Sequence, residues 1–228
     1  MTSPYLTRWV GAGLIALPVS ALMTALSTLE PQPDQERDPQ AWAEFVTTPI
    51  YLTSHLIGST GGTILGMFGF LALGIYLAGG RAARISVPAM VTAVFAQTLL
   101  LVPSVISTFV TPAVGHAYLA GIPEVMELEF PASMMGTFLL GLLLAFAGQV
   151  LLGVAVWRSS VLPKGAGALW IAAAVIFYPL GVVLGMVTTG SSLPTQPVGA
   201  LLAAVAGGWI AWTAVHRADG RGLHPHSG

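Results

Sequence analysis

The chain contains no cysteine and very little charge. Asp, Glu, Lys and Arg together make up 7% of its 228 residues, whereas a soluble domain typically carries about 25%. Without cysteine, the chain cannot form a disulfide, use a thiolate nucleophile or ligate an iron–sulfur cluster. So few charges cannot cover a water-facing surface, and the 55% of apolar residues suit lipid as the surrounding solvent.

Basic runs and buried charges are also missing. The formal net charge is −1, and no stripe of Lys and Arg exists to neutralise phosphates, so nucleic acid is not expected as a partner. The apolar segments hold no Asp, Glu, Lys or Arg, so the charged relay of many transporters is absent. No two histidines in these segments lie three or four residues apart, and we predict no metal and no cofactor.

Six apolar segments are each long enough to cross a bilayer, which takes roughly 20 residues. They cover about residues 9–29, 51–78, 86–111, 132–157, 166–188 and 196–215. We therefore predict an all-α membrane protein, a six-transmembrane-helix bundle that forms a single domain over residues 1–228. The lipid bilayer is its first expected partner.

The connecting segments divide the charged residues by sign. Seven of the eight Lys and Arg residues lie at the two ends of the chain or in segments 79–85 and 158–165. Eight of the nine acidic residues lie in segments 30–49 and 112–131, together with the single base Arg37. Because cytoplasmic loops carry an excess of Lys and Arg, we predict a multi-pass protein of the cell membrane with both termini in the cytoplasm.

An alternative interpretation concerns the first span. Arg8, the apolar stretch after it and the sequence ALS at 25–27 resemble a cleavable signal peptide. Its removal would leave five spans and an outer N-terminus with the same charge pattern. The stretch is long for the apolar region of a signal peptide, and we expect the span to be retained.

The first outer loop contains a helix signal. Asp38 is a good N-cap, and Pro39 suits the first helical position. Trp42, Phe45 and Val46 then fall on one face. We predict a short helix that lies on the outer membrane surface.

Small and polar residues follow one face of the second span. His55, Ser59, Gly62, Gly66 and Gly69 are spaced by four and three residues. Small residues let helices approach closely, so packing alone explains the glycines, and we expect Gly66 to lie in a close helix crossing. His55, at the outer end of this face, should point into the bundle.

The third span carries a polar stripe. Gln97, Ser104 and Thr111 are spaced by seven residues, with Thr108 beside them. An amide exposed to hydrocarbon is costly, so the stripe should face the interior. One interpretation is hydrogen bonding between helices and to backbone carbonyls. The other is the wall of a polar pocket that opens outward.

We predict such a pocket between spans two, three and five, covered by the long loop 112–131. It should bind or convert a small lipophilic molecule that arrives from the bilayer. The expected ligand-binding residues are Ser59, Gln97, Ser104, Thr108, Phe109 and Tyr178, and His55 should lie with them.

Two resemblances add to this interpretation. The sequence WRSSVLPKG at 157–165 closes one span and opens the next, and TSHL at 53–56 opens another. With these motifs the chain resembles small six-span actinobacterial-type membrane proteins of unknown function, which implies six spans and no assigned activity. In size and apolar character it is similar to small membrane-bound terpene cyclases. That likeness implies that an acidic side chain starts a cation cascade.

Two classes of function follow. As an enzyme, the protein would carry out proton-initiated isoprenoid cyclisation, with Glu127 or Glu124 as the acid, His55 as a proton partner, and Tyr178 and Phe109 offering π-faces to a carbocation. Ordinary solvated loop charge is the alternative interpretation of the two glutamates, and their position in a loop favours it. The alternative is a non-catalytic membrane partner, such as an immunity or accessory subunit or a homo-oligomer, held by its glycine faces. A bundle without a pocket would favour this alternative.

Overall fold

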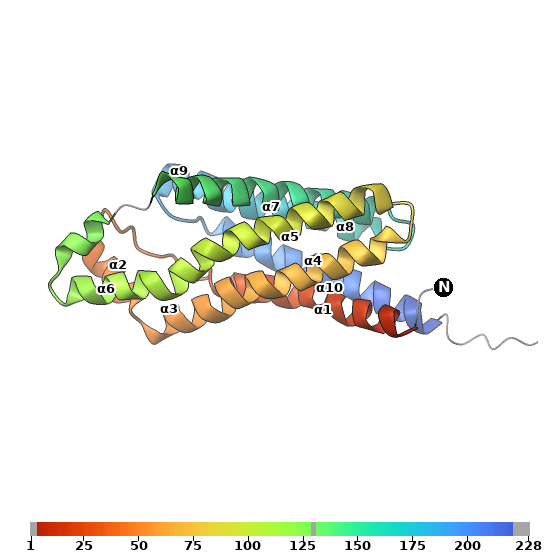
Figure 1. The fold of residues 1–228 in the computed structure, drawn as a ribbon, viewed down its shortest axis with the longest axis horizontal. Helices are drawn as coiled ribbons and strands as arrows, with labels where there is room; N and C mark the ends of the chain where they lie inside the picture. The colour runs from red at the N-terminus through yellow and green to blue at the C-terminus, as the bar shows by residue number, and fades with distance from the viewer. Residues whose placement is uncertain (1–3, 129–130, 221–228) are drawn as a thin grey trace, which may run out of the picture.

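All regular structure in the described part of the chain is helical (Figure 1). The computed structural model describes residues 4–128 and 131–220, with side chains for 9–128 and 131–217. Glu129 and Arg221 lie outside the described residues, as does the side chain of Arg8. Six helical runs are long and apolar enough to cross a membrane, which is the architecture of a multi-pass membrane protein.

Three spans are single helices and three change geometry along their length. The single helices are α1 (Pro4–Leu26), α7 (Ala132–Arg158) and α10 (Thr195–Gly220). The others contain a π-helical segment: α3 (Pro49–Ser54), η1 (His55–Gly61) and α4 (Gly62–Ala78); α5 (Ala83–Val105), η2 (Ile106–Val110) and α6 (Thr111–Leu119); α8 (Lys164–Val175), η4 (Ile176–Val183) and α9 (Leu184–Thr189). The predicted spans agree to within a few residues except the third, which continues as helix to Leu119.

The six spans form a ring. Each span packs against the spans before and after it in the sequence, and α10 closes the ring against α1. Figure 1 shows the spans running side by side along the long axis of the molecule. A ring of this kind leaves an interior that every span can reach.

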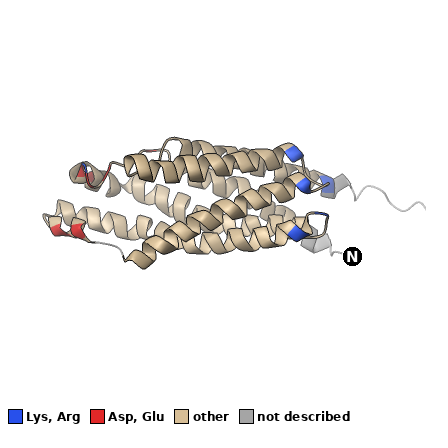
Figure 2. Ribbon diagram, turned by 90° about the horizontal axis from the view of Figure 1, so that it is seen from above, with Lys and Arg blue, Asp and Glu red and all other residues tan. Residues whose placement is uncertain are grey.

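Charge separates along this long axis. Lys and Arg gather at one end of the bundle and Asp and Glu at the other (Figure 2). We call these the basic end, with the turns 79–82 and 159–163, and the acidic end, with the α1–α2 loop, the α6–α7 loop and the α9–α10 turn. The division that the sequence predicts is therefore present in the fold.

The predicted short helix is α2 (Pro39–Val46), and it packs on protein rather than on lipid. The Asp38 carboxylate accepts the backbone N–H of Ala41 at 3.0 Å, as an N-cap does. Trp42 and Val46 are buried in a cluster that includes Val114 of α6. The apolar face of α2 is therefore covered by α6, and the membrane-surface position of this helix stays a prediction.

The basic half of the bundle is solid. Leu73 and Leu77 of α4, Leu152 of α7 and Ile210 of α10 are at most 1% exposed and belong to one core cluster. Backbones approach closely here, because a Cβ on Gly148 would lie 2.7 Å from the backbone nitrogen of Ala93. This core closes the ring interior toward the basic end.

Candidate functional site: a one-sided cavity in the helix ring

A cavity of about 370 Å³ occupies the ring interior and extends to the acidic end. All six spans line it, whereas the sequence predicted only spans two, three and five. The α1 face with Ser20 and Thr24 and the α10 face with Gln196 and Ala203 complete the wall. The cavity begins where the solid core ends and is therefore open toward one end only.

Aromatic rings form the floor. Phe70 of α4 and Trp170 of α8 meet edge to face with ring centroids 6.3 Å apart, and both also belong to the core below. Trp170 is 2% exposed, and its buried Nε1–H has no hydrogen-bond acceptor among the described residues. A buried donor without an acceptor is uncommon in native proteins. The floor is thus apolar with one unsatisfied polar atom.

A cluster of neutral polar side chains lines the cavity wall. The Nε2 of Gln149 donates to the hydroxyl oxygen of Tyr178 at 2.8 Å, and the Gln97 side chain lies beside the same hydroxyl. The rings of Phe177 and Phe146 flank Tyr178, with centroids 4.8 Å and 6.5 Å away. All of these groups are uncharged amides, phenol or hydrocarbon, so the site can offer hydrogen bonds without a charge.

Each of the three π-helical segments contributes to the cavity wall. Ser59 lies in η1, Ser107 in η2, and Tyr178 in η4. Pro179 lies inside η4, and Pro103 precedes η2 in the same span, so a missing N–H accompanies the change of geometry in these two spans. π-Helical turns are rare and frequently occur at functional sites.

Apart from the phenol of Tyr178, the titratable side chains that line the cavity lie at its mouth. His55 lies at the start of η1, with Nδ1 3.0 Å from the carbonyl oxygen of Tyr51 and its ring stacked on that of Tyr51 at 3.9 Å. Because a carbonyl only accepts, Nδ1 carries the hydrogen of the neutral ring and Nε2 remains an acceptor. Glu30, Gln32 and Phe45 of the α1–α2 segment complete the mouth.

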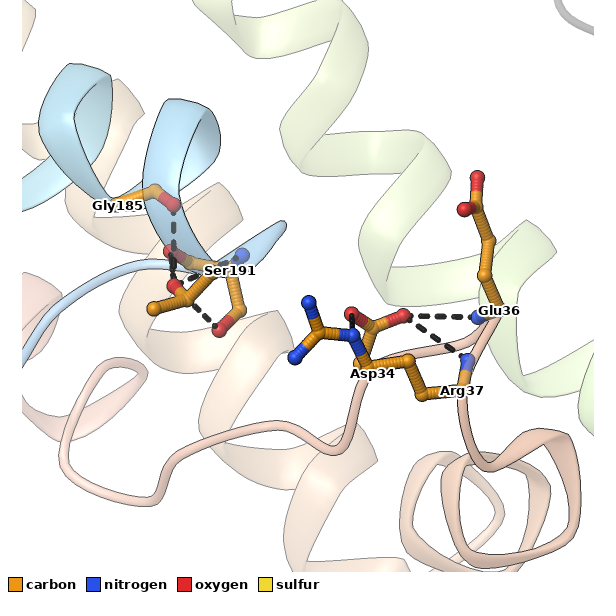
Figure 3. Close-up of polar contacts among 6 residues, drawn as sticks. Asp34, Glu36, Arg37, Gly185 and Ser191 are labelled. Atoms are coloured by element: carbon orange, nitrogen blue, oxygen red, sulfur yellow. Dashed lines mark hydrogen bonds and ion pairs between the residues drawn. The ribbon is translucent and has the colours of Figure 1, made fainter.

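The α1–α2 loop is fixed at this mouth by Asp34 (Figure 3). Its Oδ1 accepts the backbone N–H of Glu36 at 2.9 Å and of Arg37 at 3.3 Å, and its Oδ2 lies 3.5 Å from Arg37 Nε. Figure 3 shows this cluster facing the turn that contains Ser191. Gly190 in that turn has a φ of +71°, and a Cβ there would lie 3.1 Å from Asp34 Oδ2. The loop is therefore packed against the α9–α10 turn.

Five of the residues that the sequence singled out border the cavity: His55, Ser59, Gln97, Ser104 and Tyr178. Thr108 does not. It is fully buried behind the wall, where its hydroxyl lies 2.9 Å from that of Thr60 and bonds the Ser104 carbonyl. It joins η1 to η2, as the packing interpretation of the polar stripe expected.

The other three predicted site residues lie away from the cavity. Phe109 is 54% exposed on the outside of the bundle, and Glu124 and Glu127 are exposed on the 3-10 turn η3 (Pro123–Glu127) beyond α6. The expectation that loop 112–131 covers the pocket is wrong, because α6 takes up its first part as helix and the α1–α2 loop borders the mouth instead. Glu30 is the carboxylate that lines the cavity.

Gly66 also differs from expectation. It lines the cavity, and a Cβ there would meet only the Ser20 side chain at an ordinary 3.7 Å. The close crossing lies one turn further along, where a Cβ on Gly69 would be 3.0 Å from the Leu17 backbone nitrogen. The small-residue face of span two thus serves packing at one end and the cavity at the other.

In comparisons with known proteins, no family model, no curated protein and no solved structure matches the chain. The function is therefore argued from the cavity itself.

Proposed function

We propose that the protein is a cell-membrane protein that binds a small, neutral lipophilic molecule in its one-sided cavity. The observation that carries the proposal is a polar amide and phenol group held above an aromatic floor, within a space that the core closes at the basic end. The volume of about 370 Å³ falls within the usual range for small-molecule sites. Such a cavity speaks against a purely scaffolding subunit.

The charge of the lining supports a neutral ligand. Glu30 and His55 are the lining residues that can carry a charge near neutral pH, and both belong to the mouth. A charged group deeper in the cavity would lose its hydration without an ionic partner, at a cost of several kcal/mol. A hydroxyl, carbonyl or ether can instead bond to the amides and the phenol.

The charge separation supports an orientation in the membrane. Arg81, Arg84, Arg158 and Lys164 lie in or beside the turns of the basic end, which the positive-inside rule assigns to the cytoplasm. Both termini then lie in the cytoplasm, and the mouth of the cavity faces outward. Ligand reaches it from outside or from the outer leaflet.

Proton-initiated cyclisation of an isoprenoid is the second candidate. The specific observation in its favour is the set of aromatic rings around the deep half of the cavity, Phe70, Trp170, Phe177 and Tyr178, whose π-faces can stabilise a carbocation. The acid in this scheme is Glu30 at the mouth, since Glu124 and Glu127 do not reach the cavity. Conversion of geranylgeraniol to cyclic products that Glu30→Gln abolishes and Glu127→Gln leaves unchanged would establish it.

The binding proposal is tested with matched probes. Protein in phosphatidylcholine nanodiscs is titrated with geranylgeraniol or with geranylgeranyl phosphate, and occupancy is read by native mass spectrometry. We expect saturable binding of the alcohol and at least about tenfold weaker binding of the phosphate. Gly66→Leu places a branched side chain in the cavity and should lower occupancy, whereas Gly66→Ala should not. Equal binding of geranylgeraniol to wild type, Gly66→Leu and Gly66→Ala would contradict the proposal.

A further inference from the structure

A second, smaller space lies beside the cavity. It measures about 120 Å³, lies between the acidic halves of α5 and α7, and is almost wholly apolar. Pro103 and Phe138 line both this side groove and the central cavity, so the two spaces are neighbours separated by these side chains. Val102, Met134, Met135 and Thr137 form the rest of the groove.

The groove exists because α5 and α7 pack closely only toward the basic end. A Cβ on Gly148 would lie 2.7 Å from the Ala93 backbone, and one on Gly141 would lie 3.0 Å from the Leu100 side chain. In Figure 1 the run from α5 into α6 diverges from α7 toward the acidic end. Met135 and Leu139 on this part of α7 are 48% and 50% exposed. This opening lies within membrane-spanning helices.

We propose that the side groove holds the hydrocarbon chain of a single-chain amphiphile whose polar end occupies the cavity, and that the gap between α5 and α7 is its route from the outer leaflet. The proposal rests on the proposed function and names its ligand class. The side chains of Pro103 and Phe138 are a shared wall between the cavity, with its neutral amides and phenol, and an apolar groove within the membrane-spanning helices. Only a molecule with one polar end and one hydrocarbon chain matches both environments.

The groove lining suits this occupant. Met134 and Met135 have flexible thioether side chains that adapt to chains of different shape. Phe138 stands between the two spaces and is half-buried, so a rotation of its ring connects them. The Pro103 ring leaves no N–H at this point of α5, and the wall therefore presents hydrocarbon.

The test uses hexadecanol with a photoreactive diazirine at the chain end. Wild-type protein in phosphatidylcholine nanodiscs is labelled with this probe, and adducts are mapped by mass spectrometry. We expect saturable adducts on Met134, Met135 or Phe138. Adducts on residues of the mouth, such as Gln32 or Phe45, would overturn the side groove while leaving cavity binding intact. A lack of saturable labelling would overturn both.

A matched pair of variants adds a second readout. Met135→Trp fills the groove, whereas Leu139→Trp adds the same ring at a position with similar exposure that does not line it. We expect probe occupancy to fall at least about tenfold in the first and to stay within about twofold of wild type in the second. Melting curves show whether either variant is unfolded. If both variants are folded and bind the probe equally, the side groove does not hold the hydrocarbon chain.

Discussion

Gln149 of α7 and Tyr178 of η4 are hydrogen-bonded between two neighbouring spans of the ring, with Nε2 donating to the phenol oxygen at 2.8 Å. This bond joins neighbouring spans within the membrane and leaves the phenol hydrogen free to point elsewhere. Tyr178 is 5% exposed and held between Phe177 and Phe146, so its ring cannot swing away. The pair therefore holds a neutral polar group in the cavity wall, with the Gln97 side chain beside it.

Removing either partner should destabilise the protein. Tyr178→Phe leaves the Gln149 amide without its acceptor, and Gln149→Leu leaves the phenol without its donor. Interhelical bonds in membranes have coupling energies of about 0.6 kcal/mol on average, and up to about 1.7 kcal/mol. We expect each single variant to lose about 0.5–2 kcal/mol and the double variant to lose less than the sum. Unfolding in mixed micelles measures all three, and strict additivity would contradict the bond.

Substitution by alanine should destabilise the protein at a glycine in a close helix crossing but not at a glycine that lines the cavity. In Gly148→Ala the new methyl group meets the Ala93 backbone at 2.7 Å and cannot be accommodated without moving a span. Overpacking of this kind costs about 1–3 kcal/mol. Gly66→Ala has ordinary contacts and should melt like the parent or slightly above it. A Gly66→Ala variant as unstable as Gly148→Ala would show that the cavity is filled at this point.

The α1–α2 loop should loosen when its central carboxylate is removed. Arg37 is the single Lys or Arg in segments 30–49 and 112–131, which lie at the acidic end of the bundle. Trypsin added from that side can therefore cleave the loop after Arg37. Asp34→Ala removes the side-chain acceptor of both backbone N–H groups and the ion pair, and we expect cleavage after Arg37 to become several-fold faster. Glu36→Ala is the control, since only its backbone N–H takes part. Unchanged cleavage in Asp34→Ala would mean that the loop is not held by this contact.

The proposed orientation can be read by labelling single cysteines, because the parent chain has none. Gln35→Cys at the acidic end should react with an impermeant maleimide in intact cells. Gly80→Cys, exposed at the basic end with only an ordinary contact at its Cβ, should react only after permeabilisation. The reverse pattern would invert the topology and place the mouth of the cavity in the cytoplasm.

The sequence predicts the spans well because membrane thickness and hydropathy set their length. It also predicts which face of spans two and three is polar, since the period of a helix places His55, Ser59, Gln97 and Ser104 on inward faces. It could have predicted the polar face of α1, where Ser20, Thr24 and Ser27 share one side. That signal was missed because no single residue in it stands out.

The sequence could not predict which loop meets the mouth. That choice depends on contacts between distant segments: the third span continues as helix into α6, α2 packs on α6, and the α1–α2 loop packs against Gly190. Residue type and spacing single out Glu124 and Glu127, but they carry no information on distance from the cavity. Gly66 and Gly69 look alike in sequence, and only the position of α1 separates an open site from a close crossing.

The most direct test of the central claim is chemical protection of a cavity cysteine. Ser59→Cys lines the cavity, whereas Ile57→Cys lies at a similar depth on the same span, is 47% exposed and does not line it. Both are treated in intact cells with a small, impermeant cationic methanethiosulfonate, with and without geranylgeraniol. The account predicts that Cys at 59 reacts, that geranylgeraniol slows its reaction at least about tenfold, and that Cys at 57 stays unmodified in lipid. Reaction at 59 that is unaffected by the alcohol, or no reaction there from outside, would contradict an outward-opening site for a neutral lipophile.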